Sequence, residues 1–207
     1  FIPETIGSIV YLSRNLNHLK KHVIAGFNIT CIGDDRCYSY LPSRAGNSLS
    51  DIVAVHVLKH IDPEFKRYTW LDRGSNERQY CAPGVDLPVA TIMRSKYGEY
   101  PEYHTSLDDL ELVTPSGLEG GYNALRWAIK IIEKNVYLKT TVIGEPQLGK
   151  RGLYPTLSTK HPSQSVRTMM NLISYCDEQH SLLEIAELIH KPFWELLPMV
   201  EKLLDNG

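Results

Sequence analysis

The chain has 207 residues, of which 43% are hydrophobic and 22% are charged, and its formal net charge is −2 at pH 7. This composition is typical of a soluble globular protein, and the near-neutral charge predicts no general attraction to nucleic acid or to an anionic membrane. No apolar run reaches the ~18 residues of a membrane-spanning helix. Four cysteines without CxxC spacing favour free thiols in the cytoplasm over a disulfide framework.

Hydrophobic periodicity over the first two thirds of the chain predicts alternating strands and helices. Strands are expected at residues 2–5, 22–32, 68–71 and 87–93, and helices at 7–19, 48–60 and 116–134. This order predicts an α/β fold with a central, mostly parallel mixed sheet flanked by helices. Functional loops in such sheets gather at the carboxyl ends of the strands. The chain starts at Phe1 and FIPETIGSIVYL reads as the end of a strand entering a helix, so we expect a fragment that lacks N-terminal strands.

The composition changes after about residue 142, which divides the chain into a first domain (1–142), a linker (143–165) and a helical unit (166–207). Ser181 and Glu184 form a predicted capping box, and three short helices indicate a truncated helix-turn-helix or winged-helix unit. Acidic residues outnumber Lys202 after Pro192, so a packing or dimerisation role is favoured over DNA binding.

One histidine stands in a polar segment between the last predicted strand and the long helix, EYPEYHTSLDDLELV at 99–113. His104 could be a solvated loop residue, a catalytic base or a metal ligand. Asp108 and Asp109 follow it, and they could orient the imidazole, cap the next segment or face water. A neutral imidazole with a carboxylate partner is what a zinc site requires.

Three acidic residues are candidates because they stand at predicted strand ends. Glu4 precedes a Gly-Ser helix start, where it could face the catalytic edge of the sheet or simply interact with the helix dipole. Asp34 and Asp35 follow the apolar strand, where paired acids could bind a cation, although Gly-Asp-Asp is also ordinary turn composition. The polar loop at 72–88 could shape a substrate pocket.

The order of these motifs, PETIGS, GDDRCYSYLPSRAGN, GSNERQYCAPGVDLP and YHTSLDD, resembles the zinc-dependent aminopeptidases of the co-catalytic, two-metal kind. It is most similar to a bacterial aminopeptidase-like branch that carries a C-terminal winged helix. The resemblance covers residues 1 to about 135, and the tail loosely.

The resemblance implies one or two zinc ions, with one ligand set upstream of Phe1. His104 would be the final metal ligand and Glu4 the general base, with Asp34 or Asp35 as a further ligand. Arg44, Arg78, Tyr80 and Tyr103 would contact the substrate. Two positions depart from the family pattern: Glu4 stands where the wider family has two adjacent acids, and Thr30 stands where it has an aspartate.

These observations favour a zinc-dependent hydrolase that removes N-terminal residues from peptides or cleaves a related small amide by metal-activated water. The first alternative is a non-catalytic binding or regulatory protein that keeps the metallopeptidase shape. The second is a DNA-binding regulator that acts through the C-terminal helices. Neither a nucleic-acid nor a membrane partner is expected, and homo-oligomerisation stays open.

Overall fold

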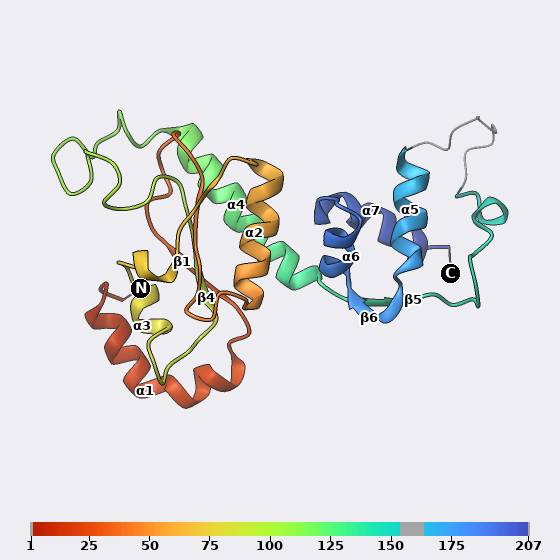
Figure 1. The fold of residues 1–207 in the computed structure, drawn as a ribbon, viewed down its shortest axis with the longest axis horizontal. Helices are drawn as coiled ribbons and strands as arrows, with labels where there is room; N and C mark the ends of the chain where they lie inside the picture. Colours follow the sequence, from red (N-terminus) through yellow and green to blue (C-terminus); the bar gives the residue numbers. More distant parts are fainter. Residues whose placement is uncertain (1, 154–163, 207) are drawn as a thin grey trace. The chain divides into compact units, whose positions relative to one another are not determined.

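The chain divides between Ile132 and Glu133 into two units, as seen in a computed structural model that describes residues 2–153 and 164–206 (Figure 1). The division falls before the boundary we predicted at residue 142. Strand β5 (Tyr137–Lys139) pairs with a strand of the second unit, so that unit includes residues from the predicted first domain. Part of the predicted linker, residues 154–163, lies outside the described residues.

The first unit is built on a four-stranded mixed sheet with the strand order β1-β4-β2-β3. Strand β1 (Gly26–Ile29) is parallel to β4 (Val89–Met93), while β2 (Ser39–Leu41) is antiparallel to β4 and parallel to β3 (Lys66–Arg67). All five residues of β4 are buried, as expected for an apolar run at the centre of a covered sheet. The predicted α/β class with a mixed sheet flanked by helices is confirmed.

The three long helices of the first unit agree with the sequence periodicity, whereas a short helix forms inside the loop predicted at 72–88 and two short predicted strands do not form. The helices are α1 (Ile6–His22), α2 (Leu49–Ile61), the short α3 (Glu77–Tyr80) and α4 (Pro115–Lys134). Residues 4–5 form a turn, and the expected strand at 68–71 is replaced in part by the 3-10 turn η1 (Trp70–Asp72). Strand β2 lies inside GDDRCYSYLPSRAGN, where we predicted no strand. It forms there because its pairing with β4 supplies the hydrogen bonds that local propensity does not.

Helix α4 lies unusually close to the backbone that follows β1. A Cβ atom at Gly117 would lie 1.9 Å from the carbonyl oxygen of Gly33, and one at Gly121 would lie 2.4 Å from that of Ile32. Glycine is therefore required at these helical positions, although it costs about 1 kcal/mol in helix propensity relative to alanine. The close approach fixes residues 31–34 at the carboxyl end of β1.

In its described residues, the second unit contains the helices α5, α6 and α7 and the two-stranded antiparallel sheet β5–β6 (Figure 1). Its elements after β5 are the 3-10 turn η2 (Leu148–Arg151), α5 (Gln164–Ser174), β6 (Asp177–Ser181), α6 (Leu182–Leu188) and α7 (Phe193–Leu204). The predicted capping box is confirmed, because the Ser181 hydroxyl accepts from the backbone N–H of Glu184 and the Glu184 carboxylate accepts from that of Ser181. Leu148 and Leu153 pack with Met169 and Ile173 of α5 and so belong to the hydrophobic core of the second unit.

None of the helices in the described ranges is both long and apolar enough to cross a membrane.

Candidate functional site

A pocket of about 360 Å³ opens where the predicted site residues are expected, at the carboxyl ends of β1 and β4. One wall is formed by residues 31–34, which directly follow β1, and the other by the long loop between β4 and α4, which Figure 1 shows in green. The lining residues are Cys31, Ile32, Gly33, Asp34, Tyr100, Tyr103, His104, Asp108, Leu112, Val113 and Leu118. The pocket therefore combines apolar, aromatic and acidic side chains with one imidazole.

His104 lines this pocket from a constrained position in the loop. Its ring stacks on that of Tyr103, with the centroids 3.9 Å apart and an angle of 17° between the planes. Its φ is +59°, a left-handed conformation that residues other than glycine rarely adopt. Such backbone strain is concentrated at functional sites, where the surrounding structure holds it in place.

Asp34, which we predicted as a metal ligand, is buried and its carboxylate bonds to the protein. Oδ1 accepts from the Ser95 hydroxyl at 2.7 Å and from the Arg36 backbone N–H at 3.0 Å, and Oδ2 accepts from the Ser95 backbone N–H at 2.8 Å. Asp34 therefore joins the loop after β1 to the residues that follow β4. This role orders the pocket wall and leaves the carboxylate poorly placed to bind a metal.

Asp35 is engaged elsewhere, at the start of α4. Its carboxylate accepts hydrogen bonds from the hydroxyls of Thr114 and Ser116, the latter at 2.8 Å. These two bonds, the Thr114 bond first, lower the pKa of Asp35, opposed in part by burial. The two adjacent acids thus serve different structural tasks and do not form the cation site expected of a pair.

Glu4 is held at the same edge of the sheet by the segment around α3. Its Oε1 accepts from the Ser75 hydroxyl at 2.9 Å, and the backbone N–H of Thr5 donates to Asn76 Oδ1 at 2.8 Å. Arg78, predicted as a substrate contact, donates to the Thr5 hydroxyl at 3.3 Å. Burial, the thiol of Cys31 and the Glu4 carboxylate raise the pKa of Tyr103, so Glu4 lies within electrostatic reach of the pocket wall.

Glu77, which no sequence pattern singled out, is a fully buried carboxylate behind the Ser75 segment. Its Oε1 accepts from the backbone N–H groups of Gly74 at 2.7 Å and Ser75 at 2.9 Å, and from the Tyr97 hydroxyl at 2.8 Å. Its Oε2 accepts from the side-chain amide of Asn28 at 3.0 Å. Nothing in the polar run GSNERQY distinguishes this acid from a solvated one, because its partners come from distant strands and loops.

Cys31 and Tyr100 were also missed as pocket residues. The Tyr100 hydroxyl donates to Cys31 Sγ at 3.5 Å, and Cys31 has a φ of +47°. Burial raises the pKa of Tyr100, and the bond to Cys31 raises it further, so the phenol stays protonated and remains a donor. Thr5 and His104 also have positive φ.

Two of the predicted substrate contacts do not reach the pocket. Arg44 forms an ion pair with Asp86, its Nε donating at 2.8 Å. Because β2 is antiparallel to β4, residues after β2 and before β4 lie at the edge opposite to the pocket. Tyr80 packs against an apolar cluster that includes Leu12 and Leu87.

The described residues do not complete a zinc site. Across residues 2–153 and 164–206, no group of three or more His, Cys, Asp or Glu side chains could hold a metal ion. His104 would contribute one imidazole, but Asp34 and Asp35, the other predicted ligands, have their carboxylates bonded to Ser95 and to residues at the start of α4. A tight zinc site needs three or four protein ligands, which this donor set does not supply.

The chain thus combines two parts. The first is an α/β domain with a pocket at the carboxyl ends of β1 and β4, called here the strand-edge pocket, and the second is a small winged-helix unit. Residues 1–135 match a family described as a domain of unknown function (DUF4910), and the chain belongs to this family. Residues 135–207 match a winged helix-turn-helix family.

Two relatives from Clostridium acetobutylicum are similar to almost the whole chain. One, 39% identical over 189 residues that make up 90% of this chain, has the provisional name of a polysaccharide biosynthesis protein with an aminopeptidase-like domain. The other is a crystal structure provisionally named a peptidase, with a TM-score of 0.86 and 34% identity over 99% of this chain. The chain spans 43% of the first relative and 46% of the second.

An aminopeptidase from Aneurinibacillus sp. strain AM-1 is similar at the level of the fold alone. Its TM-score is 0.51 at 16% identity, over 61% of this chain and 30% of that protein. The relatives of this chain are thus named peptidase or aminopeptidase-like, and the expected resemblance is confirmed at that level.

Proposed function

We propose that this chain carries part of the active site of an aminopeptidase-type hydrolase, which removes N-terminal residues from peptides or cleaves a related small amide. One observation carries the proposal: Glu4 and His104, far apart in the sequence, lie at one strand edge. Tyr103 lies near both residues. Its ring stacks on that of His104, and the negative charge of Glu4 is among the causes that raise the pKa of Tyr103.

In this proposal Glu4 is the general base. Its carboxylate is exposed, and the Ser75 hydroxyl fixes its position through Oε1. A carboxylate in this position can take a proton from the attacking water and pass it to the leaving amine. Glu77 supports this geometry from behind, because it accepts from the backbone N–H of Ser75.

The pocket supplies the features needed to hold an amino-terminal residue. The carboxylate of Asp108 lines it and suits the protonated amine of a peptide. Leu112, Val113 and Leu118 offer an apolar wall for the first side chain. The Tyr100 hydroxyl can turn from Cys31 Sγ and donate instead to a carbonyl oxygen of the substrate.

A zinc requirement remains a separate part of the proposal. When bound, zinc in such enzymes lowers the pKa of a water and polarises the scissile carbonyl. The described residues would supply one imidazole, that of His104, toward it. Elemental analysis of the longest available form and its His104→Ala variant tests the requirement. Zinc lost on substitution supports His104 as a ligand, and equal zinc in both proteins removes it from the ligand set.

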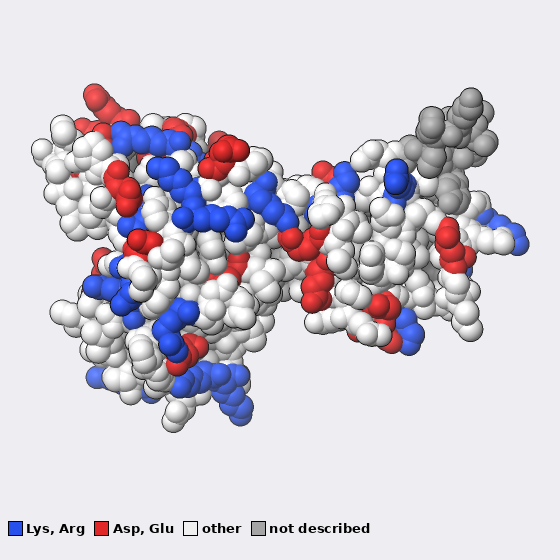
Figure 2. Space-filling view, viewed as in Figure 1, with Lys and Arg blue, Asp and Glu red and all other residues white. Residues whose placement is uncertain are grey.

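The second candidate function is non-catalytic recognition of a peptide or small amide by the same pocket. The engagement of Asp34 with Ser95 favours it, because a predicted metal ligand then serves only the scaffold. The surface charge does not favour nucleic acid as a ligand. On the face drawn in Figure 2, basic side chains are interspersed with acidic ones, and α7 contains Lys202 together with Glu195 and Glu201.

Hydrolysis of aminoacyl-p-nitroanilides by the longest available form, compared with its Glu4→Gln variant, tests the first candidate. Loss of a general base lowers kcat by about 10²–10⁴-fold and changes KM little. Glu64→Gln, an exposed acid in the turn before β3, is the matched control and keeps the parent kcat. Normal turnover by Glu4→Gln would remove Glu4 from the base role. Saturable peptide binding without turnover by the parent would favour the second candidate.

A further inference from the structure

Helix α1 carries two histidines one turn apart near its C-terminal end. His18 and His22 are both exposed, and their ring centroids lie 4.5 Å apart with an angle of 37° between the planes. Residues four apart lie on the same side of a helix, so the two imidazoles share one flank of α1. A different face of the helix, with Leu12, Leu16 and Leu19, packs against an apolar cluster of the first unit. The histidine pair is therefore open to solvent.

The spacing of the two rings fits coordination of one metal ion by both imidazoles. An ion about 2.1 Å from one nitrogen of each ring, with its two bonds about 90° apart, places the ring centroids about 4.5 Å apart. Two bonds at the tetrahedral angle would place the centroids about 5.2 Å apart. The observed 4.5 Å therefore matches the square-planar or tetragonal coordination of Ni²⁺ and Cu²⁺ better than the tetrahedral coordination of zinc.

The ring nitrogens of the pair are available to such an ion. Among residues 2–153 and 164–206, none forms a hydrogen bond or an ion pair with the imidazole of His18 or His22. Lys20 and Lys21 lie in the same last turn, and their charges oppose a cation. The partial negative charge at the C-terminal end of the helix favours one. Because these two effects act in opposite directions, the imidazole ligands decide the affinity.

A second pair of histidines has the same sequence spacing but lacks this access. His56 and His60 lie on α2, with their ring centroids 4.8 Å apart and an angle of 64° between the planes. His56 is fully buried, so an ion that carries its water shell does not reach the ring. Exposure, and not the spacing of four residues alone, thus distinguishes the pair on α1.

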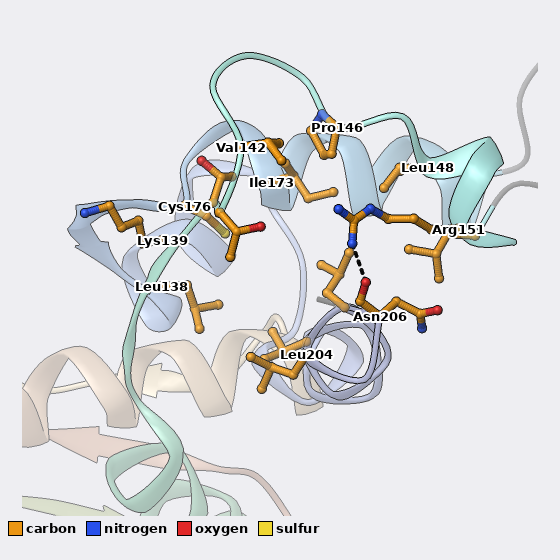
Figure 3. Close-up of a pocket in the computed structure, with 15 residues that line it drawn as sticks. Leu138, Lys139, Val142, Pro146, Leu148, Arg151, Ile173, Cys176, Leu204 and Asn206 are labelled. Carbon is orange, nitrogen blue, oxygen red and sulfur yellow. Dashed lines mark hydrogen bonds between the residues drawn. The ribbon is translucent and has the colours of Figure 1, made fainter.

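Two further side chains of the kinds that bind transition metals lie in the second unit and interact with the protein. Cys176 lies at the wall of the pocket drawn in Figure 3, and its thiol donates to the carbonyl oxygen of Leu172 at 3.3 Å. Burial, and after it the charge of Asp177, raises the pKa of this thiol to about 11, so the metal-binding thiolate is scarce at neutral pH. The Nδ1 atom of His180 lies 3.0 Å from the Asp177 carboxylate. His180 is therefore a suitable control for a single imidazole.

We propose that His18 and His22 together bind one divalent transition-metal ion of the nickel and copper kind, with water at the remaining positions of the ion. Two protein ligands are fewer than the three or four of a tight zinc site, so the ion is exchangeable. The pair lies at the C-terminal end of α1, whereas Glu4 precedes the first turn of this helix. The site is thus separate from the function proposed for the strand-edge pocket.

Calorimetric titration of the untagged chain with Ni²⁺ tests this assignment. The parent is expected to bind one Ni²⁺ ion at this pair, and an excess of Mg²⁺, which prefers oxygen ligands, should not displace it. His18→Gln and His22→Gln each remove one of the two ligands and should weaken binding at least about tenfold. The controls are His180→Gln and His104→Ala, which remove imidazoles elsewhere and should keep the affinity of the pair.

One double variant tests the geometry while it keeps the number of histidines. Lys20→His combined with His22→Gln places the two imidazoles two residues apart, where they do not face each other. It also removes a positive charge, yet it should bind Ni²⁺ as weakly as His22→Gln alone. The proposal is overturned if the parent shows no saturable Ni²⁺ binding or if the double variant binds as tightly as the parent. It is equally overturned if His180→Gln or His104→Ala weakens binding as much as His18→Gln does.

Discussion

Replacing Glu77 by alanine is expected to destabilise the first unit by about 4 kcal/mol. The carboxylate accepts four hydrogen bonds, two from backbone N–H groups and two from the side chains of Asn28 and Tyr97. Gly74, which supplies one of the backbone donors, is exposed, so water can replace the lost acceptor there. Asn28 and Tyr97 are 9% and 8% exposed, so their donors would be left buried without this partner.

The magnitude follows from those two orphaned donors. Leaving a buried donor unsatisfied costs about 1–3 kcal/mol, which gives about 2–6 kcal/mol for the pair. Glu77→Gln should cost only about 1 kcal/mol, because the amide oxygen can keep the bonds of Oε1. The Asn28 amide can also rotate to accept from the new NH₂ group.

Urea unfolding followed by tryptophan fluorescence measures these differences. A Trp194→Phe background leaves Trp70 and Trp127, both in the first unit, as reporters. Glu119→Ala, which removes an exposed acid from α4, is the control and should stay within about 0.5 kcal/mol of the parent. A loss below about 1 kcal/mol for Glu77→Ala, or equal losses for the alanine and glutamine variants, would refute the reasoning.

Two further predictions concern the walls of the strand-edge pocket. Gly117→Ala should lower the unfolding free energy by about 1–3 kcal/mol in the same urea assay, because the new Cβ would lie 1.9 Å from the carbonyl oxygen of Gly33. A stability equal to or above that of the parent would contradict the close approach of α4. Hydrogen bonding to Arg36 lowers the pKa of Glu102 to about 2, so the stabilisation by this contact is present above the ordinary pKa of 4.5 and is lost as pH falls toward 2. Carboxyl NMR titration should show this low midpoint for Glu102 and a return to near 4.5 in Arg36→Gln, and an unchanged midpoint would exclude the ion pair as its cause.

Local patterns in the sequence were sufficient for the elements with strong periodicity. The apolar run at 87–93 predicted β4, and the helical spacing at 48–60 and 116–134 predicted α2 and α4. The capping box at Ser181 located the start of α6. These elements form where they were predicted because their hydrogen bonds or caps are satisfied within a few residues.

The sequence by itself determined the α/β class, the long helices and the winged-helix unit. Only the tertiary structure decided that Asp34 bonds to Ser95, that Arg44 lies at the opposite edge and that Glu77 is a buried acceptor. The physical reason is that the sequence names an acidic residue in the same way whether its carboxylate faces water, a metal or buried hydrogen-bond donors. Its role is fixed by partners that the fold brings from distant parts of the chain.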